Sequence, residues 1–267
     1  MRQFFKNFLP EPFIVAIRNS QDFINRIPEI PNAYFHPWRR NMASRLAALE
    51  NKYHGERSFI IGNGPSLRNT DLSKLRNEYT FGMNRIYLAF PEMGFSTSFF
   101  VSINDLVIEQ TATDIQKLSI PKFIAWRSHH WLTPSDNLYF LYTTYTEPIF
   151  AKKATGRLWE GATVTYVALQ LAYFLGFKEV ILIGVDHSFT TQGKPNETVV
   201  SQGDDPNHFH PAYFGKGFRW QLPDLRTSEM AYRMAKEAFA KDDRKVIDAT
   251  MGGKLTVFPK VEYERLF

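Results

Sequence analysis

Two stretches of the chain are apolar without interruption, and small or polar residues follow each of them at once. Residues 59–61 run into Gly62-Asn63-Gly64-Pro65-Ser66, and residues 180–183 run into Gly184-Val185-Asp186. Continuous apolar runs of this length are typical of strands that are buried on both faces, and these occur mostly in parallel sheets. The pattern therefore predicts central parallel strands that end in turns at a ligand-binding edge.

Strand-like and helix-like segments alternate over the rest of the chain. The segments with strand character are residues 58–61, 79–83, 98–103, 122–126, 138–142, 179–184 and 245–248. The segments with helical character are residues 41–53, 71–76, 105–117, 163–175 and 227–241. The segment 163–175 is the clearest, because its apolar residues recur every three or four positions and Gly176 ends it. The alternation predicts an α/β fold with a Rossmann-like, doubly wound and mostly parallel sheet.

Residues 187–225 form the longest stretch without periodicity. Prolines, glycines and histidines are mixed there with the aromatic residues Phe189, Phe209, Tyr213, Phe214, Phe218 and Trp220. A loop this long inside a compact domain is typically a lid or a binding loop, and its aromatic content argues against disorder. We therefore predict a lid over the C-terminal edge of the sheet.

Residues 1–54 precede the sheet pattern and are rich in Phe, Pro and Arg. Their prolines predict short helical pieces, so we expect an N-terminal helical arm at 1–54 and a nucleotide-sugar-binding catalytic domain at 55–267. We expect the arm to pack on that domain, and peripheral contact with a membrane is the alternative. Residues 1–10 do not resemble a signal peptide, and no run reaches the roughly 18 apolar residues of a spanning helix. These features predict a cytoplasmic protein, peripheral at the inner membrane face if the alternative holds.

The amino-acid composition excludes several kinds of site and partner. The chain has 267 residues, 44% of them hydrophobic, which is enough for one large α/β domain with an appendage. It has no cysteine, which excludes disulfides, thiolate zinc sites and a cysteine nucleophile. The net charge of +5 favours anionic partners, but the basic residues are scattered, so nucleic acid is not a predicted partner. Homo-oligomer formation stays open.

Four of the predicted strands end in polar side chains. These are Asn63, Asn84, Asn104 and the run Asp186-His187-Ser188. Because the carboxyl ends of parallel strands meet at one edge of a sheet, we expect them to contact a ligand there. An amide suits a nucleobase edge, a ribose or a sugar hydroxyl, although any single Asn could instead be a turn residue.

The turn after the first strand has features of a phosphate site. Gly62 and Gly64 lack Cβ atoms, so the backbone there can lie close to another molecule. Pro65 and Ser66 predict a rigid turn into a helix whose free N–H groups suit a phosphate. The turn is neither a dinucleotide fingerprint, because Leu67 replaces the third glycine, nor a P-loop, because no lysine follows the second glycine.

Group transfer generally needs a base, and the predicted lid offers His208 and His210. The alternative for each is a histidine that is merely hydrogen-bonded within the loop. No cluster has the spacing of metal ligands, so no metal site is predicted, and a Gly-x-Ser-x-Gly nucleophile motif is absent.

Three segments together resemble bacterial sialyltransferases of glycosyltransferase family 42. They are residues 60–67 (Ile-Ile-Gly-Asn-Gly-Pro-Ser-Leu), 83–85 (Met-Asn-Arg) and 175–186, which end in Gly-Val-Asp. The wider group that the chain resembles includes the flagellin-associated Maf glycosyltransferases and archaeal 6-hydroxymethylpterin diphosphokinase MptE-like proteins. The resemblance spans roughly residues 57–250.

This resemblance implies a glycosyltransferase that uses a nucleotide-activated, CMP-linked and sialic-acid-like sugar, with no cofactor or metal, and a glycan or protein hydroxyl as acceptor. It implies donor contacts for Asn63, Gly64, Ser66, Asn84 and Asn104, and a helix start at Thr163 that faces the cytidine. It also implies that His208 deprotonates the acceptor. Where the sialyltransferases carry phosphate-binding tyrosines, this chain has His187-Ser188-Phe189 and, further on, Lys194.

Two alternatives stay open. The first is a diphosphokinase that acts on a pterin-like alcohol with ATP and magnesium, for which Asp105, Asp186, Asp204 and Asp205 are the candidate carboxylates. The second is a non-catalytic module that binds a nucleotide or a glycan.

Overall fold

The computed structural model describes residues 11–267. Its centre is an eight-stranded sheet in the order β10-β7-β1-β2-β3-β4-β5-β6, and all of its pairings are parallel. The strands are β1 (Arg57–Ile61), β2 (Tyr79–Met83), β3 (Phe99–Ser102), β4 (Lys122–Ala125), β5 (Leu138–Thr144), β6 (Arg157–Trp159), β7 (Glu179–Ile183) and β10 (Lys245–Asp248). The predicted Rossmann-like, mostly parallel sheet is therefore confirmed.

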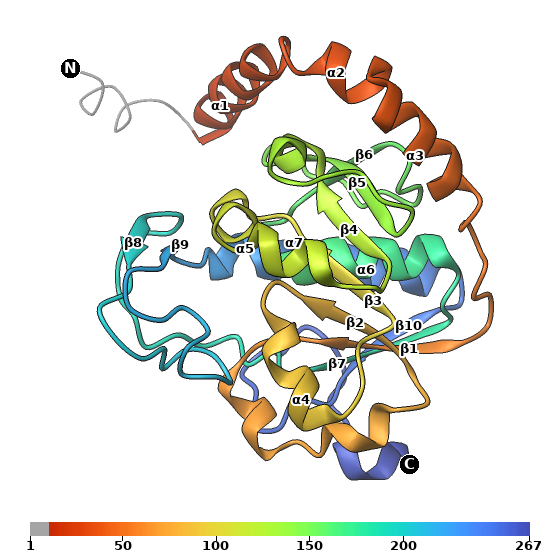
Figure 1. The fold of residues 1–267 in the computed structure, drawn as a ribbon, viewed down its shortest axis with the longest axis vertical. Helices are drawn as coiled ribbons and strands as arrows, with labels where there is room; N and C mark the ends of the chain where they lie inside the picture. The colour runs from red at the N-terminus through yellow and green to blue at the C-terminus, as the bar shows by residue number, and fades with distance from the viewer. Residues whose placement is uncertain (1–10) are drawn as a thin grey trace.

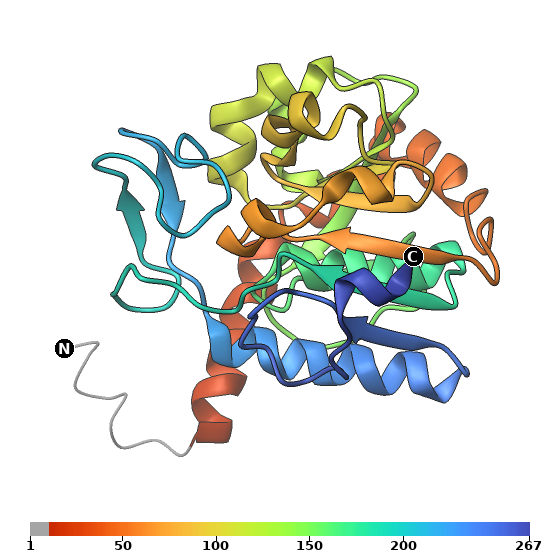
Figure 2. The ribbon, with the colours of Figure 1, turned by 90° about the horizontal axis from the view of Figure 1, so that it is seen from below.

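Helices cover both faces of this sheet (Figures 1 and 2). They are α1 (Glu11–Arg26), α2 (Ile30–Phe35), α3 (Pro37–Ala47), α4 (Phe90–Met93), α5 (Asp105–Lys117), α6 (Val164–Leu175) and α7 (Leu225–Lys241). In Figure 2 the blue α7 and the yellow-green α5 lie on opposite sides of the strands. Every residue of α6 from Thr165 onward is buried, because the helix lies between the sheet and α7.

The strand order reverses at β1. The chain proceeds from β1 to β2, β3 and β4 on one side, whereas β7 pairs with the other side of β1. Ile61 is in register with Ile183, so the turns that follow these two strands lie next to each other. Such a reversal opens a crevice beyond the carboxyl ends of the strands, which is where open α/β sheets bind ligands.

The predicted helix over 41–53 has the wrong bounds. Pro37 begins α3 and the His36 side chain caps it, but the helix ends at Ala47. The backbone N–H groups of Asn51 and Tyr53 instead donate to the last carbonyls of α6, at Phe174 and Leu175. These tertiary hydrogen bonds override the helical periodicity of the sequence.

Two further expectations about local structure need correction. The predicted helix over 71–76 is a single 3₁₀ turn at Leu72–Leu75, capped by Asp71. Strand β6 was not predicted, because three residues are too few to produce a recognisable pattern.

The lid is confirmed, and it is more ordered than a plain loop. It contains β8 (Thr198–Val200) and β9 (Arg219–Gln221), which pair antiparallel. Its side chains form a hydrophobic cluster with Val107 of α5, and the buried lid members are Tyr213, Phe214, Trp220 and Leu222. Figure 1 shows this segment projecting from the end of the sheet where β1 terminates.

The arm packs along the β5 side of the sheet (Figure 1). Ala33, Met42 and Leu46 are buried, and the ring of Tyr34 meets that of Tyr142 at 5.3 Å. Residues 1–10 of the predicted arm lie outside the described residues, and the division at residue 54 stays a prediction. The helices within residues 11–267 are all too short or too polar to cross a membrane.

Candidate functional site

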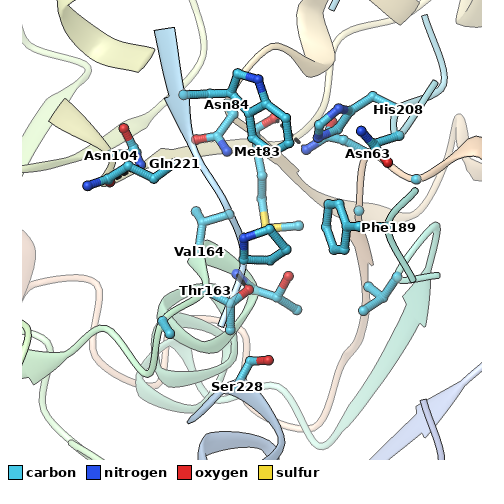
Figure 3. Close-up of a pocket in the computed structure, with 18 of the residues that line it drawn as sticks. Asn63, Met83, Asn84, Asn104, Thr163, Val164, Phe189, His208, Gln221 and Ser228 are labelled. Atoms are coloured by element: carbon cyan, nitrogen blue, oxygen red, sulfur yellow. Dashed lines mark hydrogen bonds between the residues drawn. The ribbon is translucent and has the colours of Figure 1, made fainter. Parts of the chain in front are cut away.

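A cavity of about 270 Å³ lies beyond the carboxyl ends of β1, β2, β3 and β7 (Figure 3). The turns after these strands form its floor, the first residues of α6 and α7 form one wall, and the lid covers it. Most of the predicted site residues line it, namely Gly62, Asn63, Gly64, Asn84, Asn104, Thr163, Asp186, His187, Ser188 and His208. The fold therefore brings together strand ends that are far apart in the sequence.

The two glycines of the floor are required by the protein's own packing. A Cβ at Gly62 would lie 2.2 Å from the carbonyl oxygen of Gly184, and one at Gly64 would lie 1.9 Å from a carboxylate oxygen of Asp186. Close packing of the turn after β7 therefore requires these glycines, and close approach of a ligand to them stays a prediction.

Ser66 does not line the cavity. Its backbone N–H donates to Oδ1 of Asp186 at 3.1 Å, and its hydroxyl donates to Oδ2 at 2.6 Å. The predicted helix after Pro65 is a five-residue 3₁₀ helix, Pro65–Asn69. The donors that the sequence assigned to a phosphate are therefore used to hold the turns after β1 and β7 together.

Asn63 carries an unused acceptor in the cavity wall. Its Nδ2 donates to the carbonyl of Met83 at 3.2 Å, whereas its buried Oδ1 has no hydrogen-bond partner within residues 11–267. A buried acceptor without a partner is unusual in a folded protein and is often completed by a ligand or by water.

The side chains of Asn84 and Asn104 already form hydrogen bonds within the protein. Ser102 donates to Oδ1 of Asn84 at 3.0 Å. Asn104 caps α5, accepting the N–H of Leu106 at 3.0 Å, and its Nδ2 donates to Gln221 of the lid at 3.1 Å (Figure 3). Asn104 therefore fastens the lid to α5 as well as lining the cavity.

Four of the lining residues have left-handed backbone conformations without being glycine. They are Asn84 (φ 51°), Ala162 (φ 58°), His187 (φ 55°) and Asn196 (φ 64°). Such conformations carry a cost of about 1–3 kcal/mol each and tend to occur at functional sites.

The start of α6 is the cavity's anion-attracting element. Residues Ala162, Thr163, Val164 and Thr165 all line the cavity, and the Thr163 side chain caps the helix by accepting the N–H of Thr165 at 3.3 Å. The positive end of the helix dipole and the unpaired N–H groups of a first turn favour negative charge.

The ring of His208 is held by a buried carboxylate. Its Nδ1 lies 2.7 Å from Oδ2 of Asp205, a carboxylate only 3% exposed that also accepts the N–H groups of Asn207 and Phe214. The ring stacks on Tyr213 at 4.1 Å. With Nδ1 protonated toward Asp205, Nε2 is the acceptor nitrogen. Figure 3 places His208 beside Asn63, across the cavity from Thr163.

His210 and Lys194 lie outside the cavity, as Ser66 does. Nδ1 of His210 accepts the N–H of Ala212 at 3.1 Å, which stabilises a turn of the lid. Lys194 is exposed on the far part of the lid. Of the two predicted bases, only His208 is therefore positioned to meet a substrate in this cavity.

A second histidine–carboxylate pair, which the sequence did not predict, also borders the cavity. Nε2 of His187 lies 3.2 Å from Oε1 of Glu229 in α7. Unlike Asp205, Glu229 is 37% exposed and shares its charge with Arg233. The two residues of the pair are 42 positions apart, so no local pattern could have joined them.

One end of the cavity holds a buried ionic cluster that the sequence also did not reveal. Arg127 bonds to Asp105 at 2.7 Å and to Glu160, and its guanidinium lies 4.5 Å from the ring centre of Tyr145. Burial lowers the pKa of Arg127, but the negative charges of Glu160 and Asp105 outweigh the effect of burial, so the pKa of Arg127 is raised overall. Burial raises the pKa of Glu160, against the opposing effect of Arg127.

The carboxylates predicted for magnesium do not converge. Asp105 bonds to Arg127, Asp205 to His208, and Asp204 is exposed. Within residues 11–267 no three His, Asp or Glu side chains are grouped as metal ligands. Asp186 lines the cavity, but both of its carboxylate oxygens accept hydrogen bonds from Ser66, so the described carboxylates do not form a preformed magnesium site.

The fold and the cavity define a Rossmann-like α/β protein with a ligand site at the switch point of its sheet. The family model described as 6-hydroxymethylpterin diphosphokinase MptE-like matches residues 32–192. Because this match covers more than half of the chain, the protein belongs to the 6-hydroxymethylpterin diphosphokinase MptE-like family, whose members are typically transferases. A search of curated proteins found no match.

Proposed function

We propose that this protein is a glycosyltransferase that moves a sugar from a CMP-linked donor to a hydroxyl group of a glycan or protein. The observation that carries the proposal is the pair formed by His208 and the buried Asp205. This pair leaves one ring nitrogen available as a base at a cavity that also contains the start of α6.

In the proposed reaction, Nε2 of His208 takes the proton of the acceptor hydroxyl while that oxygen bonds to the anomeric carbon of the sugar. The bond between this carbon and the phosphate oxygen breaks, and its electron pair leaves with CMP. The start of α6 stabilises the charge on the departing phosphate. The unpartnered Oδ1 of Asn63 accepts a hydroxyl or amino group of the nucleoside.

The charge of the cavity supports a donor with a single phosphate. Arg127 is the only lysine or arginine among the described residues that line it, and two carboxylates already pair with it. A phosphodiester carries one negative charge, which a helix N-terminus can accommodate. A nucleoside triphosphate carries several charges and is usually bound with lysine and magnesium.

A diphosphokinase is the second candidate, and the description of the matching family favours it. His208 would then take the proton of an alcohol that attacks ATP. A magnesium ion held chiefly by the ATP phosphates would neutralise their charge, and Asp186 could contact it only by giving up a hydrogen bond from Ser66.

A thermal-shift screen with CMP, CDP, UDP, GDP and ATP, each with and without magnesium, separates the two candidates. A ligand at about 100 times its dissociation constant adds about 2.7 kcal/mol to the free energy of unfolding. A metal-independent shift with CMP, followed by release of CMP from a CMP-sugar in the presence of an acceptor, would support the glycosyltransferase. A shift only with ATP and magnesium would favour the diphosphokinase. Binding without turnover would indicate a binding module, and no shift would argue against all three.

A further inference from the structure

The arm exposes an unusual number of large hydrophobic side chains. Among the side chains that the structure describes, sixteen such residues are exposed, and eight of them lie between residues 13 and 38. We call seven of these the apolar arm face, namely Phe13, Ile17, Phe23, Ile24, Ile27, Phe35 and Trp38; the eighth, Tyr34, packs its ring on Tyr142. Isolated exposed apolar residues are normal, but a cluster of this size marks an interaction surface.

Helix α1 is turned opposite to an ordinary surface helix. Phe13, Ile17 and Ile24 are spaced by four and seven residues, so they share one face, and that face is exposed. The polar side of α1 instead contacts the body of the protein. Asp22 accepts the hydroxyl of Thr146, and Arg26 pairs with Glu147 at 3.5 Å. These polar contacts direct the apolar side of the helix outward.

The charge of the arm indicates what this face contacts. Residues 1–54 contain eight lysines and arginines against four acidic residues. Arg39 is buried and Arg26 pairs with Asp22 and Glu147, but the other six basic residues still outnumber the other three acidic ones. Arg40, which follows Trp38 closely in α3, is exposed. Aromatic and aliphatic side chains beside basic ones are typical of helices that lie in the interface of an anionic membrane.

We propose that the apolar arm face docks onto an anionic phospholipid surface. Figures 1 and 2 both place α1 toward the end of the molecule that carries β8 and β9, the end at which the cavity lies. The turn that α1 binds, at Thr146 and Glu147, directly follows Tyr145, which lines the cavity. A membrane held by this face therefore lies on the outer side of α1, at the end of the molecule that carries the cavity.

Co-sedimentation of the full chain with lipid vesicles tests this proposal. We expect the protein to sediment with vesicles of phosphatidylcholine and phosphatidylserine, to sediment less with phosphatidylcholine alone, and to be released as salt increases. The double variant I17D/I24D should lower vesicle binding by about tenfold or more, because two charges replace apolar contacts with the lipid.

The matched control is M251D/V261D, which adds the same charge at apolar residues that are 47% and 36% exposed away from the arm. Circular dichroism and thermal unfolding verify that both double variants are folded. Retained binding by the control and lost binding by I17D/I24D supports docking through the arm. Equal loss in both variants overturns the proposal, because net charge alone would then explain it. A wild-type dimer that I17D/I24D dissociates, without vesicle binding, overturns it in favour of a second copy of the chain.

Discussion

The floor and the lid of the cavity are each organised by one aspartate, but the two aspartates act differently. In the floor, Asp186 ties the turn after β7 to the turn after β1 by accepting both donors of Ser66. In the lid, Asp205 accepts two backbone N–H groups and holds the ring of His208. Asp186 thus holds two turns together, whereas Asp205 also orients the ring of His208, which is able to take a proton.

The floor of the cavity has a structural role, whereas the lid carries the residue that we propose for catalysis. The floor is set by close backbone packing that admits only glycine at residues 62 and 64. The lid is set by side-chain hydrogen bonds and aromatic contacts, and it holds the candidate base. The family match covers the floor and ends at residue 192, before Asp205 and His208. The part of the chain that the family model matches therefore builds the floor of the cavity, and the part beyond the match supplies most of the lid and the base we propose.

We expect the largest effect on kcat from a substitution in the lid. His208→Ala should lower kcat by about 10²–10⁴-fold, because general base catalysis typically contributes that much. Nucleotide binding, measured by thermal shift, should persist. His210→Ala is the matched control and should keep nearly full turnover, since His210 lies outside the cavity. Full turnover in His208→Ala would refute the assignment of the base.

Asp205→Asn should lower kcat by about 10–100-fold, because an amide cannot accept from Nδ1 of His208 and from two N–H groups as the carboxylate does. Asp205 is a positioning residue, so the KM for the nucleotide donor should change little. Asp204→Asn, at the exposed neighbouring residue, is the control. Equal losses of kcat in the two variants would show that Asp205 has no special role.

A substitution in the floor of the cavity should change the stability of the protein. Gly64→Ala should lower the free energy of unfolding by about 1–3 kcal/mol, because its Cβ would overlap the Asp186 carboxylate. Chemical denaturation measures this change. Gly203→Ala is the control, since a Cβ there meets nothing within 4 Å. A Gly64→Ala variant as stable as Gly203→Ala would mean that the floor is not sterically determined.

We expect the smallest effect on kcat from a substitution in the pair formed by His187 and Glu229. Glu229→Gln should change kcat by less than about threefold, because an exposed carboxylate that is shared with Arg233 interacts weakly with His187. Steady-state kinetics beside Asp205→Asn provides the comparison. If Glu229→Gln proved as damaging as Asp205→Asn, His187 would become the better candidate for the base.

Much of the scaffold could be read from the sequence because its signals are local. The apolar runs at 59–61 and 180–183 predicted buried parallel strands, and the spacing within 163–175 predicted α6, which ends at Gly176 as expected. Polar residues directly after those strands predicted where a ligand site would form. Each of these predictions depends on neighbours within a few positions along the chain.

Only the tertiary structure decided how those polar groups are used. Ser66 and Asp186 lie 120 positions apart, and their contact converts a predicted phosphate site into a brace of the floor. Hydrogen bonds to the end of α6 stop the predicted helix at Ala47. The packing of the lid, not the spacing of its histidines, placed His208 at the cavity and His210 outside it. Hydrogen-bond donors and acceptors find partners by distance in space, so periodicity along the chain determines the elements but not these pairings.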